Sequence, residues 1–372
     1  MNVAFRVDAS TEIGLGHVAR CLSLAQALSE LGAVCRFLTR DLGIDVARQV
    51  RLAGFECHAL PAPATNHRPP SAGYPHADWA GVDWSVDVQE SIAALGDARP
   101  GWVIVDHYSF DASWHRAMRR WAGCRMAAID DLGDRDLDVD LLIDHNHAID
   151  HRAKYGSHLA ANAPILAGPR CALIGPSYAN ARRHTVRAAV RSIGIFMGGA
   201  DRGGFSQTAL RACDAAGFRG EIEVVTTSAN PGLAALQIQI ANRPGARLSM
   251  DLPSLADFYV RHDVQIGASG GSTWERCCVG SPTLAIIVAE NQRMVLQPLD
   301  GLGVLLAVDE IPVSVDSLAR ELRTLIDNPG LRESLSARAR QLVDGRGAQR
   351  VAEYLLQSCS QLTSSAPILS TP

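Results

Sequence analysis

The feature that most constrains this chain is a repeated alternation of short apolar runs with longer amphipathic stretches. The stretch at residues 17–31 carries Leu22, Ala25, Leu28 and Leu31 on one face, as an amphipathic helix does. Strands that alternate with helices form a parallel sheet with right-handed crossovers. The first half therefore predicts a doubly wound α/β domain. Its apolar runs lie at residues 2–7, 34–38, 56–60, 102–105, 125–129 and 141–143.

The alternation begins again after a break at residues 163–176 that is rich in Gly and Pro. We expect two Rossmann-like domains, residues 1–175 and 176–346, with the ligand in the cleft between the carboxyl ends of their sheets. Residues 347–358 predict a helix that packs back across both domains, and residues 359–372 predict a disordered tail. The apolar runs of the second half lie at residues 191–196, 222–225, 247–250, 264–267 and 282–288.

Composition excludes several classes of protein. The 372 residues include 35 Lys and Arg against 39 Asp and Glu, a formal net charge of −4, which does not fit a basic nucleic-acid binder. No apolar run reaches the roughly 18 residues that cross a bilayer, and the first residues lack the pattern of a signal peptide. We therefore expect a cytoplasmic monomer with no nucleic-acid or membrane partner.

No metal site or cofactor is expected. The segment from Asp144 to His147 holds two alternate histidines but no further ligands for zinc. The nine cysteines are an odd number and lack Cys-x-x-Cys spacing, so we expect reduced thiols.

The loop after the first predicted strand runs from Asp8 to His17 and leads directly into a helix. Gly14 and Gly16 allow a ligand to approach the backbone, and the free amides of a helix start favour an anion such as a diphosphate. The spacing also matches a loose dinucleotide fingerprint, but six residues separate the strand from Gly14. His17 stands where a general base is useful. A cap-region histidine without a catalytic role is the alternative.

Polar residues also follow the fourth and fifth predicted strands. Asp106, His107 and Tyr108 follow the fourth, where an Asp beside a His can orient an imidazole or a substrate hydroxyl. Asp130 and Asp131 follow the fifth, and for them helix capping is the simpler explanation.

In the second half, Gly198 and Gly199 follow the first strand and form a candidate phosphate cradle. A stronger signal is the run Gly271, Ser272 and Thr273, which leads into a helix. Its amides can hold a diphosphate.

Glu275 follows two residues later, where its carboxylate can accept both ribose hydroxyls. Alternatively, Ser272 is the N-cap and Glu275 its capping-box partner. Farther along, Asn291 and Gln292 place polar amides at the same end of the sheet.

Several motifs, in this order, resemble the UDP-sugar hydrolases of pseudaminic acid biosynthesis, which act on UDP-2,4-diacetamido-2,4,6-trideoxy-β-L-altropyranose. These enzymes are related to GT-B glycosyltransferases. The resemblance spans about residues 1–345. The motifs are FRVDAS at 5–10, IGLGHVARCL at 13–22, VDHY at 105–108, DDL at 130–132, GGAD at 198–201, GSTWERC at 271–277 and ENQ at 290–292.

The resemblance implies a GT-B-like fold and metal-independent hydrolysis at the anomeric carbon, with inversion, that releases UDP and a free sugar for a surface polysaccharide or flagellin glycan. It implies that His17 is the general base, that Tyr108 and Asn291 line the pocket, and that Glu275 holds the ribose. The full set of expected substrate-binding residues is Asp8, Gly14, Gly16, Arg20, Asp106, His107, Tyr108, Asn291 and Gln292. The expected UDP-binding residues are Gly198, Gly199, Gly271, Ser272, Thr273 and Glu275.

Two other functions remain open. A GT-B glycosyltransferase would move the sugar to an acceptor, and a nucleotide-sugar sensor would bind without reacting. A transferase for a lipid-linked acceptor would need an exposed apolar and basic surface on its first domain, and the sequence shows no such run.

Overall fold

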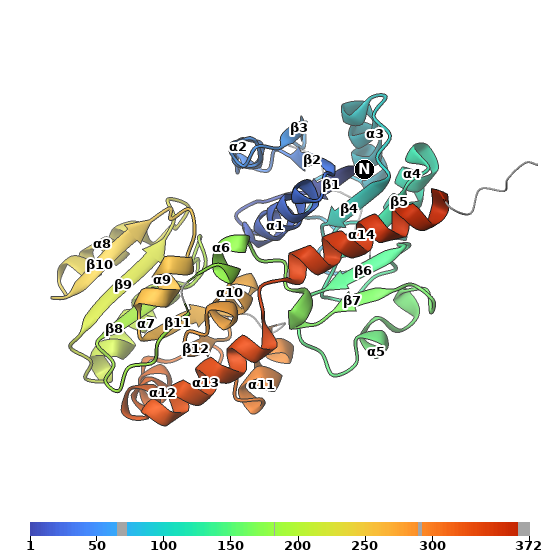
Figure 1. The fold of residues 1–372 in the computed structure, drawn as a ribbon. Helices are drawn as coiled ribbons and strands as arrows, with labels where there is room; N and C mark the ends of the chain where they lie inside the picture. Colours follow the sequence, from blue (N-terminus) through green and yellow to red (C-terminus); the bar gives the residue numbers. More distant parts are fainter. Residues whose placement is uncertain (65–72, 182, 289–291, 364–372) are drawn as a thin grey trace, which may run out of the picture. The chain divides into compact units, whose positions relative to one another are not determined.

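A computed structural model describes residues 1–64, 73–181, 183–288 and 292–363 of the chain (Figure 1). Internal packing divides it into two units, each built on its own sheet. Unit 1 comprises Met1–His145, Asp150–Gly175 and the segment from Gly347 onward, and unit 2 comprises Asn146–Ile149 and Pro176–Arg346.

Unit 1 contains a seven-stranded parallel sheet in the order β3-β2-β1-β4-β5-β6-β7. Its strands are β1 (Asn2–Val7), β2 (Val34–Arg40), β3 (Glu56–Leu60), β4 (Trp102–Asp106), β5 (Arg125–Ile129), β6 (Leu141–Asp144) and β7 (Ile165–Ala167). Its α-helices are α1 (Gly16–Glu30), α2 (Val46–Leu52), α3 (Trp84–Leu95), α4 (Ala112–Ala122), α5 (His151–Tyr155) and α14 (Gly347–Thr363).

Both faces of this sheet are buried, which explains why its strands are nearly continuous apolar runs. Alternate residues of β4 enter opposite clusters: Ile104 packs on one face with α1 and α14, and Val103 on the other with Trp114 of α4. Figure 1 shows α14 (red) beside α1, and Val351 of α14 belongs to the core of unit 1. The helix continues to Thr363, beyond the predicted end at 358.

Unit 2 contains a six-stranded parallel sheet in the order β10-β9-β8-β11-β12-β13. Its strands are β8 (Ser192–Phe196), β9 (Glu221–Thr226), β10 (Ala246–Met250), β11 (Val264–Ala268), β12 (Thr283–Ile286) and β13 (Leu306–Val308). Its α-helices are α6 (Pro176–Ala179), α7 (Phe205–Ala215), α8 (Leu233–Ala241), α9 (Ala256–Arg261), α10 (Gly271–Val279), α11 (Arg293–Gly301), α12 (Val315–Asp327) and α13 (Pro329–Leu342).

The predicted α/β class with two doubly wound sheets is confirmed. In each sheet the strand order reverses at one point, between β1 and β4 in unit 1 and between β8 and β11 in unit 2. Open α/β sheets bind ligands at the carboxyl ends of the strands beside such a reversal. In unit 1, Val7 pairs with Asp106, so the loops after β1 and β4 start next to each other.

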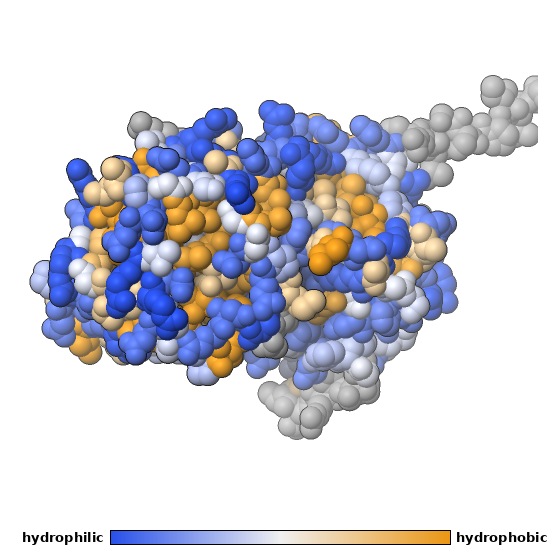
Figure 2. All heavy atoms as spheres, turned by 90° about the horizontal axis from the view of Figure 1, so that it is seen from below, coloured by the Kyte–Doolittle hydropathy of each residue, from blue (hydrophilic) through white to orange (hydrophobic). Residues whose placement is uncertain are grey.

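Two strands were not predicted. The break assigned to residues 163–176 contains β7, and β13 lies in a segment for which no strand was predicted. Among the described residues, no helix has the length and apolar character needed to cross a bilayer. Figure 2 shows one face of the molecule, where hydrophobic groups are divided by hydrophilic side chains. The eight cysteines whose side chains the structure describes are free thiols.

Candidate functional site

The loop after β1 positions the start of α1. Its turn is held by Ser10, whose Oγ accepts hydrogen bonds from the N–H groups of Glu12 and Ile13, both at 3.1 Å. Gly14 has a φ of +77°, which favours glycine. No side chain of the described segments caps α1, so the amides of its first turn are available to an anionic ligand.

There is open space at both glycines of this loop. A Cβ added at Gly14 or at Gly16 would meet no atom within 4 Å. Packing within the protein therefore does not require glycine at position 16. Access for a ligand does explain it.

His17, Arg20 and Asp106 form one cluster. The Nδ1 of His17 lies 2.6 Å from Oδ1 of Asp106, and Nε and Nη2 of Arg20 each donate to the same carboxylate at 2.6 Å. Because a carboxylate only accepts, Nδ1 of His17 carries the proton. The lone pair of the neutral ring is therefore on Nε2, and His17 is 8% exposed.

The charge state of Asp106 is set by its surroundings. Burial alone would raise the pKa of this carboxyl, but the adjacent Arg20 guanidinium holds the pKa well below its ordinary range. Asp106 is therefore an anion that fixes the tautomer and orientation of His17.

Tyr108 packs against the same histidine. Its ring lies 4.8 Å from the His17 ring, centroid to centroid, with the ring planes 78° apart. Its hydroxyl donates to Asp131, while Asp130 accepts from the N–H groups of Leu132 and Gly133 in a local turn. Helix capping, the simpler explanation offered for these two aspartates, is therefore wrong, because no helix begins in the described residues between β5 and β6: Asp130 stabilises a turn, and Asp131 orients the Tyr108 ring beside His17.

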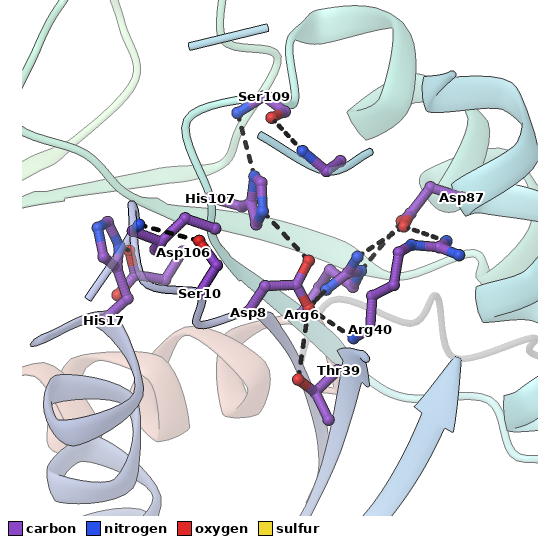
Figure 3. A network of polar contacts seen from close by, with 12 residues as sticks. Arg6, Asp8, Ser10, His17, Thr39, Arg40, Asp87, Asp106, His107 and Ser109 are labelled. Carbon is purple, nitrogen blue, oxygen red and sulfur yellow. Dashed lines mark hydrogen bonds and ion pairs between the residues drawn. The ribbon is translucent and has the colours of Figure 1, made fainter. Parts of the chain in front are cut away.

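Asp8 and His107 lie in a buried polar network next to this cluster (Figure 3). The Nδ1 of His107 accepts from the N–H of Ser109, so its Nε2 carries the proton and faces Oδ2 of Asp8 at 3.1 Å. Oδ1 of Asp8 accepts from Nη1 of Arg6 and from the N–H of Arg40.

The side chains of Asp8 and His107 are at most 3% exposed, so they connect the loops after β1 and β4 inside the protein. The two glycines of the first loop, by contrast, border open space.

In unit 2, the start of α10 is built by Arg276. This buried residue donates to the carbonyl of Ala268 at 2.9 Å and to the hydroxyls of Ser272 and Thr273 at 3.1 and 3.2 Å. A Cβ at Gly267 would lie 2.4 Å from its Nη1, which explains the glycine. Arg276 belongs to the motif at residues 271–277 but is not among the residues predicted to bind UDP.

The start of α10 does not form the capping box between Ser272 and Glu275 that the sequence offered as an alternative. Gly270 is the N-cap, and its N–H is 3.4 Å from Oγ1 of Thr273, so Ser272 lies inside the first turn. The backbone N–H groups of Gly271 and Ser272 are among those that a helix cannot bond internally. Such a start suits a phosphate group.

Glu275 contacts two tyrosines instead of the helix start. The hydroxyl of Tyr259 donates to its Oε2 at 3.3 Å, and the hydroxyl of Tyr178 also donates to it. Burial raises the pKa of Glu275. An ionised carboxylate has about four acceptor positions, so two tyrosines leave room for further donors such as ribose hydroxyls.

The loop after β8 is more closed than predicted. Gly198 has a φ of +87°, and the carbonyl of Gly199 accepts from Oγ1 of Thr227 at 2.9 Å. Asp201 accepts from the N–H groups of Phe205 and Ser206, both at 2.9 Å, at the start of α7. The first amides of α7 are thus occupied by a side chain.

Gln292 lies close to the α10 loop. Its Oε1 accepts from Oγ of Ser269 at 2.5 Å and from the N–H of Val288 at 3.0 Å. Asn291, predicted beside it, lies outside the described residues. No group of three or more potential metal ligands occurs in the described part of the chain.

The chain is similar in sequence to part of one curated protein and similar in fold to several solved structures. No family model matches the chain. The spore coat polysaccharide biosynthesis protein SpsG of Bacillus subtilis (strain 168) is 27% identical over 203 residues, which are 53% of this chain and 60% of SpsG. The match therefore spans less than two thirds of that relative.

Solved structures match nearly the whole chain. MurG of Acinetobacter baumannii aligns with a TM-score of 0.67 and 13% identity, over 96% of this chain and 99% of MurG. UGT2 of Phytolacca americana, complexed with UDP-2fluoro-glucose and pterostilbene, aligns with a TM-score of 0.66 and 15% identity, over 98% and 100%. Glycosyltransferase VinC in complex with dTDP aligns with a TM-score of 0.61 and 14% identity, over 97% and 100%. The chain has a GT-B glycosyltransferase-like fold, as predicted.

Proposed function

We propose that this protein hydrolyses a UDP-activated sugar, releasing UDP and the free sugar with inversion at the anomeric carbon. The substrate class is a UDP-2,4-diacetamido-2,4,6-trideoxy sugar, from the order of motifs along the chain. The observation that carries the proposal is the pair His17 and Asp106, in which a buried anion leaves the Nε2 lone pair of His17 free to accept a proton.

The chemical step needs one activated water molecule. The water oxygen forms a bond to the anomeric carbon as the bond from that carbon to the UDP oxygen breaks. The water proton passes to Nε2 of His17, and Nδ1–H keeps its hydrogen bond to Asp106, which stabilises the imidazolium without being protonated. A single displacement of this kind inverts the anomeric centre.

Unit 2 supplies the binding of UDP in this proposal. The free amides at the start of α10 hold the diphosphate, where negative charge grows as the bond breaks. Glu275 accepts the ribose hydroxyls. Gln292 and the turn at Ser269 support the same loop. Since α7 is capped by Asp201, α10 is the better diphosphate site of the two.

A glycosyltransferase is the second candidate, because the aligned structures include glycosyltransferases and SpsG is named for polysaccharide biosynthesis. In that case His17 would deprotonate an acceptor hydroxyl in place of water.

The test is to incubate the protein with UDP-2,4-diacetamido-2,4,6-trideoxy-β-L-altropyranose and follow the anomeric proton by NMR. Hydrolysis predicts free sugar of inverted configuration and an equal amount of UDP without any acceptor. If the sugar leaves UDP only when an acceptor is added, the protein is a transferase. An unchanged substrate in both mixtures supports the sensor.

A further inference from the structure

The segment of residues 73–83, just before α3, is fixed next to the proposed base. Three hydrogen bonds attach it to Ser109: Oη of Tyr74 donates to the carbonyl of Ser109 at 2.8 Å, Oγ of Ser109 donates to the carbonyl of His76 at 2.8 Å, and the N–H of Ala80 donates to that Oγ at 2.9 Å. Ser109 is itself buried and follows Tyr108 directly. The segment is therefore positioned relative to the ring that packs on His17.

This attachment brings together three rings from two separate segments of the chain, which we term the aromatic wall: His76, Trp79 and Tyr108. The ring centroids of His76 and Trp79 are 4.2 Å apart. The ring centroid of Tyr108 lies 5.7 Å from that of His76 and 5.8 Å from that of Trp79. Tyr108 in turn lies 4.8 Å from the ring of His17. The wall thus starts at the proposed base and extends away from it.

The wall is not part of the hydrophobic core. His76 and Trp79 are partly exposed, and neither belongs to the core clusters of unit 1. A rigid, partly exposed indole next to a polar reaction centre is a surface typical of ligand sites, which combine aromatic area with a few polar groups.

We propose that the aromatic wall binds the sugar group of the nucleotide sugar, with Trp79 packed against the C–H face of the pyranose ring. The inference rests on the proposed function, since a sugar whose anomeric carbon reacts with water at His17 must lie within a few ångströms of Tyr108. A pyranose presents C–H groups on its face and, in a deoxy or N-acetylated sugar, methyl groups at its rim. These are the parts that an aromatic surface removes from water.

The test separates sugar binding from turnover. The affinities of UDP and of UDP-2,4-diacetamido-2,4,6-trideoxy-β-L-altropyranose are measured by calorimetry in the His17→Asn background, which is expected not to consume the sugar nucleotide. Adding Trp79→Ala should weaken binding of the sugar nucleotide about tenfold and leave UDP binding unchanged. Trp79→Phe should retain most of the affinity because it keeps an aromatic face.

Trp84→Ala is the matched control, because Trp84 is 39% exposed in the same unit and makes no ring contact with the wall in the described structure. It should change neither affinity. Equal affinities for the sugar nucleotide with and without Trp79, or an equal loss for UDP, would overturn the proposal. If the wild-type protein binds the sugar nucleotide in a Trp79-dependent way yet releases no UDP, the wall stands and the hydrolase proposal fails.

Discussion

Nδ1 of His17 lies 2.6 Å from Oδ1 of Asp106, although 89 positions separate the two residues in the sequence. The contact forms because β1 and β4 are neighbours in the sheet and their carboxyl ends coincide. The imidazole at the start of α1 thereby contacts a buried anion at the end of β4, and this contact fixes the orientation of the ring.

Replacing His17 with Asn should slow turnover by about 10²-fold to 10⁴-fold, the range for loss of a general base, and leave UDP affinity unchanged. Asn retains a hydrogen-bonding side chain but cannot take a proton. Steady-state kinetics and calorimetry measure the two quantities. His158→Asn is the control, since His158 forms a similar pair with Asp136 at 2.7 Å on the surface. Nearly full activity in His17→Asn would refute the assignment of the base.

Asp106→Asn should lower both activity and stability. The free energy of unfolding should fall by about 3–5 kcal/mol, because the buried Arg20 guanidinium loses its anionic partner. The pKa of Asp106 is lower in the folded state than in the unfolded state, so its ionised form stabilises the fold above the ordinary pKa of about 3.9. This contribution declines as the pH falls below that value.

Denaturant melts at several pH values check this prediction for Asp106. The stability difference between wild type and Asp106→Asn should be largest near neutral pH and shrink below about pH 4. Asp136→Asn, on the surface, should show a difference near zero. If the difference in free energy of unfolding between wild type and Asp106→Asn increases toward acid pH, the ion pair does not stabilise the fold.

Glu275→Ala should weaken UDP binding by roughly 1–3 kcal/mol, the range for loss of a charged hydrogen-bond partner. The ribose dependence is tested with 2′,3′-dideoxy-UDP, which should bind wild type and variant equally. If calorimetry shows the same UDP affinity in both proteins, Glu275 serves only the two tyrosines.

The pH dependence of UDP binding follows from the same carboxylate. Burial raises the pKa of Glu275, so protonation starts at a pH above the ordinary value of about 4.3. A protonated carboxyl accepts ribose hydroxyls less well, so UDP affinity should decrease as the pH falls through this region. The free energy of unfolding of the UDP-free protein depends on pH in the opposite direction. The raised pKa of Glu275 favours folding at low pH, and this contribution is lost as the pH rises through the folded-state pKa.

Turnover should survive excess EDTA, because the helix starts present backbone amides to the charge of UDP. The rate is compared before and after chelation and again after addition of Mg²⁺. Loss with EDTA and recovery with Mg²⁺ would contradict the proposal and direct attention to Asp106, Asp130 and Asp131 as ligands.

Gly267→Ala should destabilise the protein by about 1–3 kcal/mol, because the added Cβ would lie 2.4 Å from Arg276. UDP affinity should fall as well, since Arg276 shapes the start of α10. Gly270→Ala is the control: its Cβ would meet nothing within 4 Å and its backbone is extended. Equal melting temperatures for the two variants would show that the Arg276 side chain can move away from the added Cβ without loss of stability.

The fold class was predictable because buried parallel strands are long apolar runs. The first predicted strand, residues 2–7, coincides with β1. β7 and β13 are also apolar, but each has only three residues, and an apolar run that short does not distinguish a strand from a helix or a loop.

The loops of the candidate site were predictable because chemistry collects at the carboxyl ends of parallel strands. The partners within them were not. Arg6, Arg40 and Asp87 are charged and yet fully buried, and a sequence pattern places such residues on the surface. Only the three-dimensional structure shows that Arg6 and Arg40 pair with the carboxylates of Asp8 and Asp87.

The return of α14 to unit 1 has a consequence for biosynthesis. Val351 and Leu355 complete a core that also contains Leu24, which is translated more than 300 positions earlier. Unit 2 is fully synthesised before them, so the first sheet gains this covering helix only after the whole of unit 2 has been translated. Domains that fold during synthesis usually do so from the N-terminus. Here one apolar face of the first sheet is covered only in part, by α1 and α2, until α14 has been synthesised.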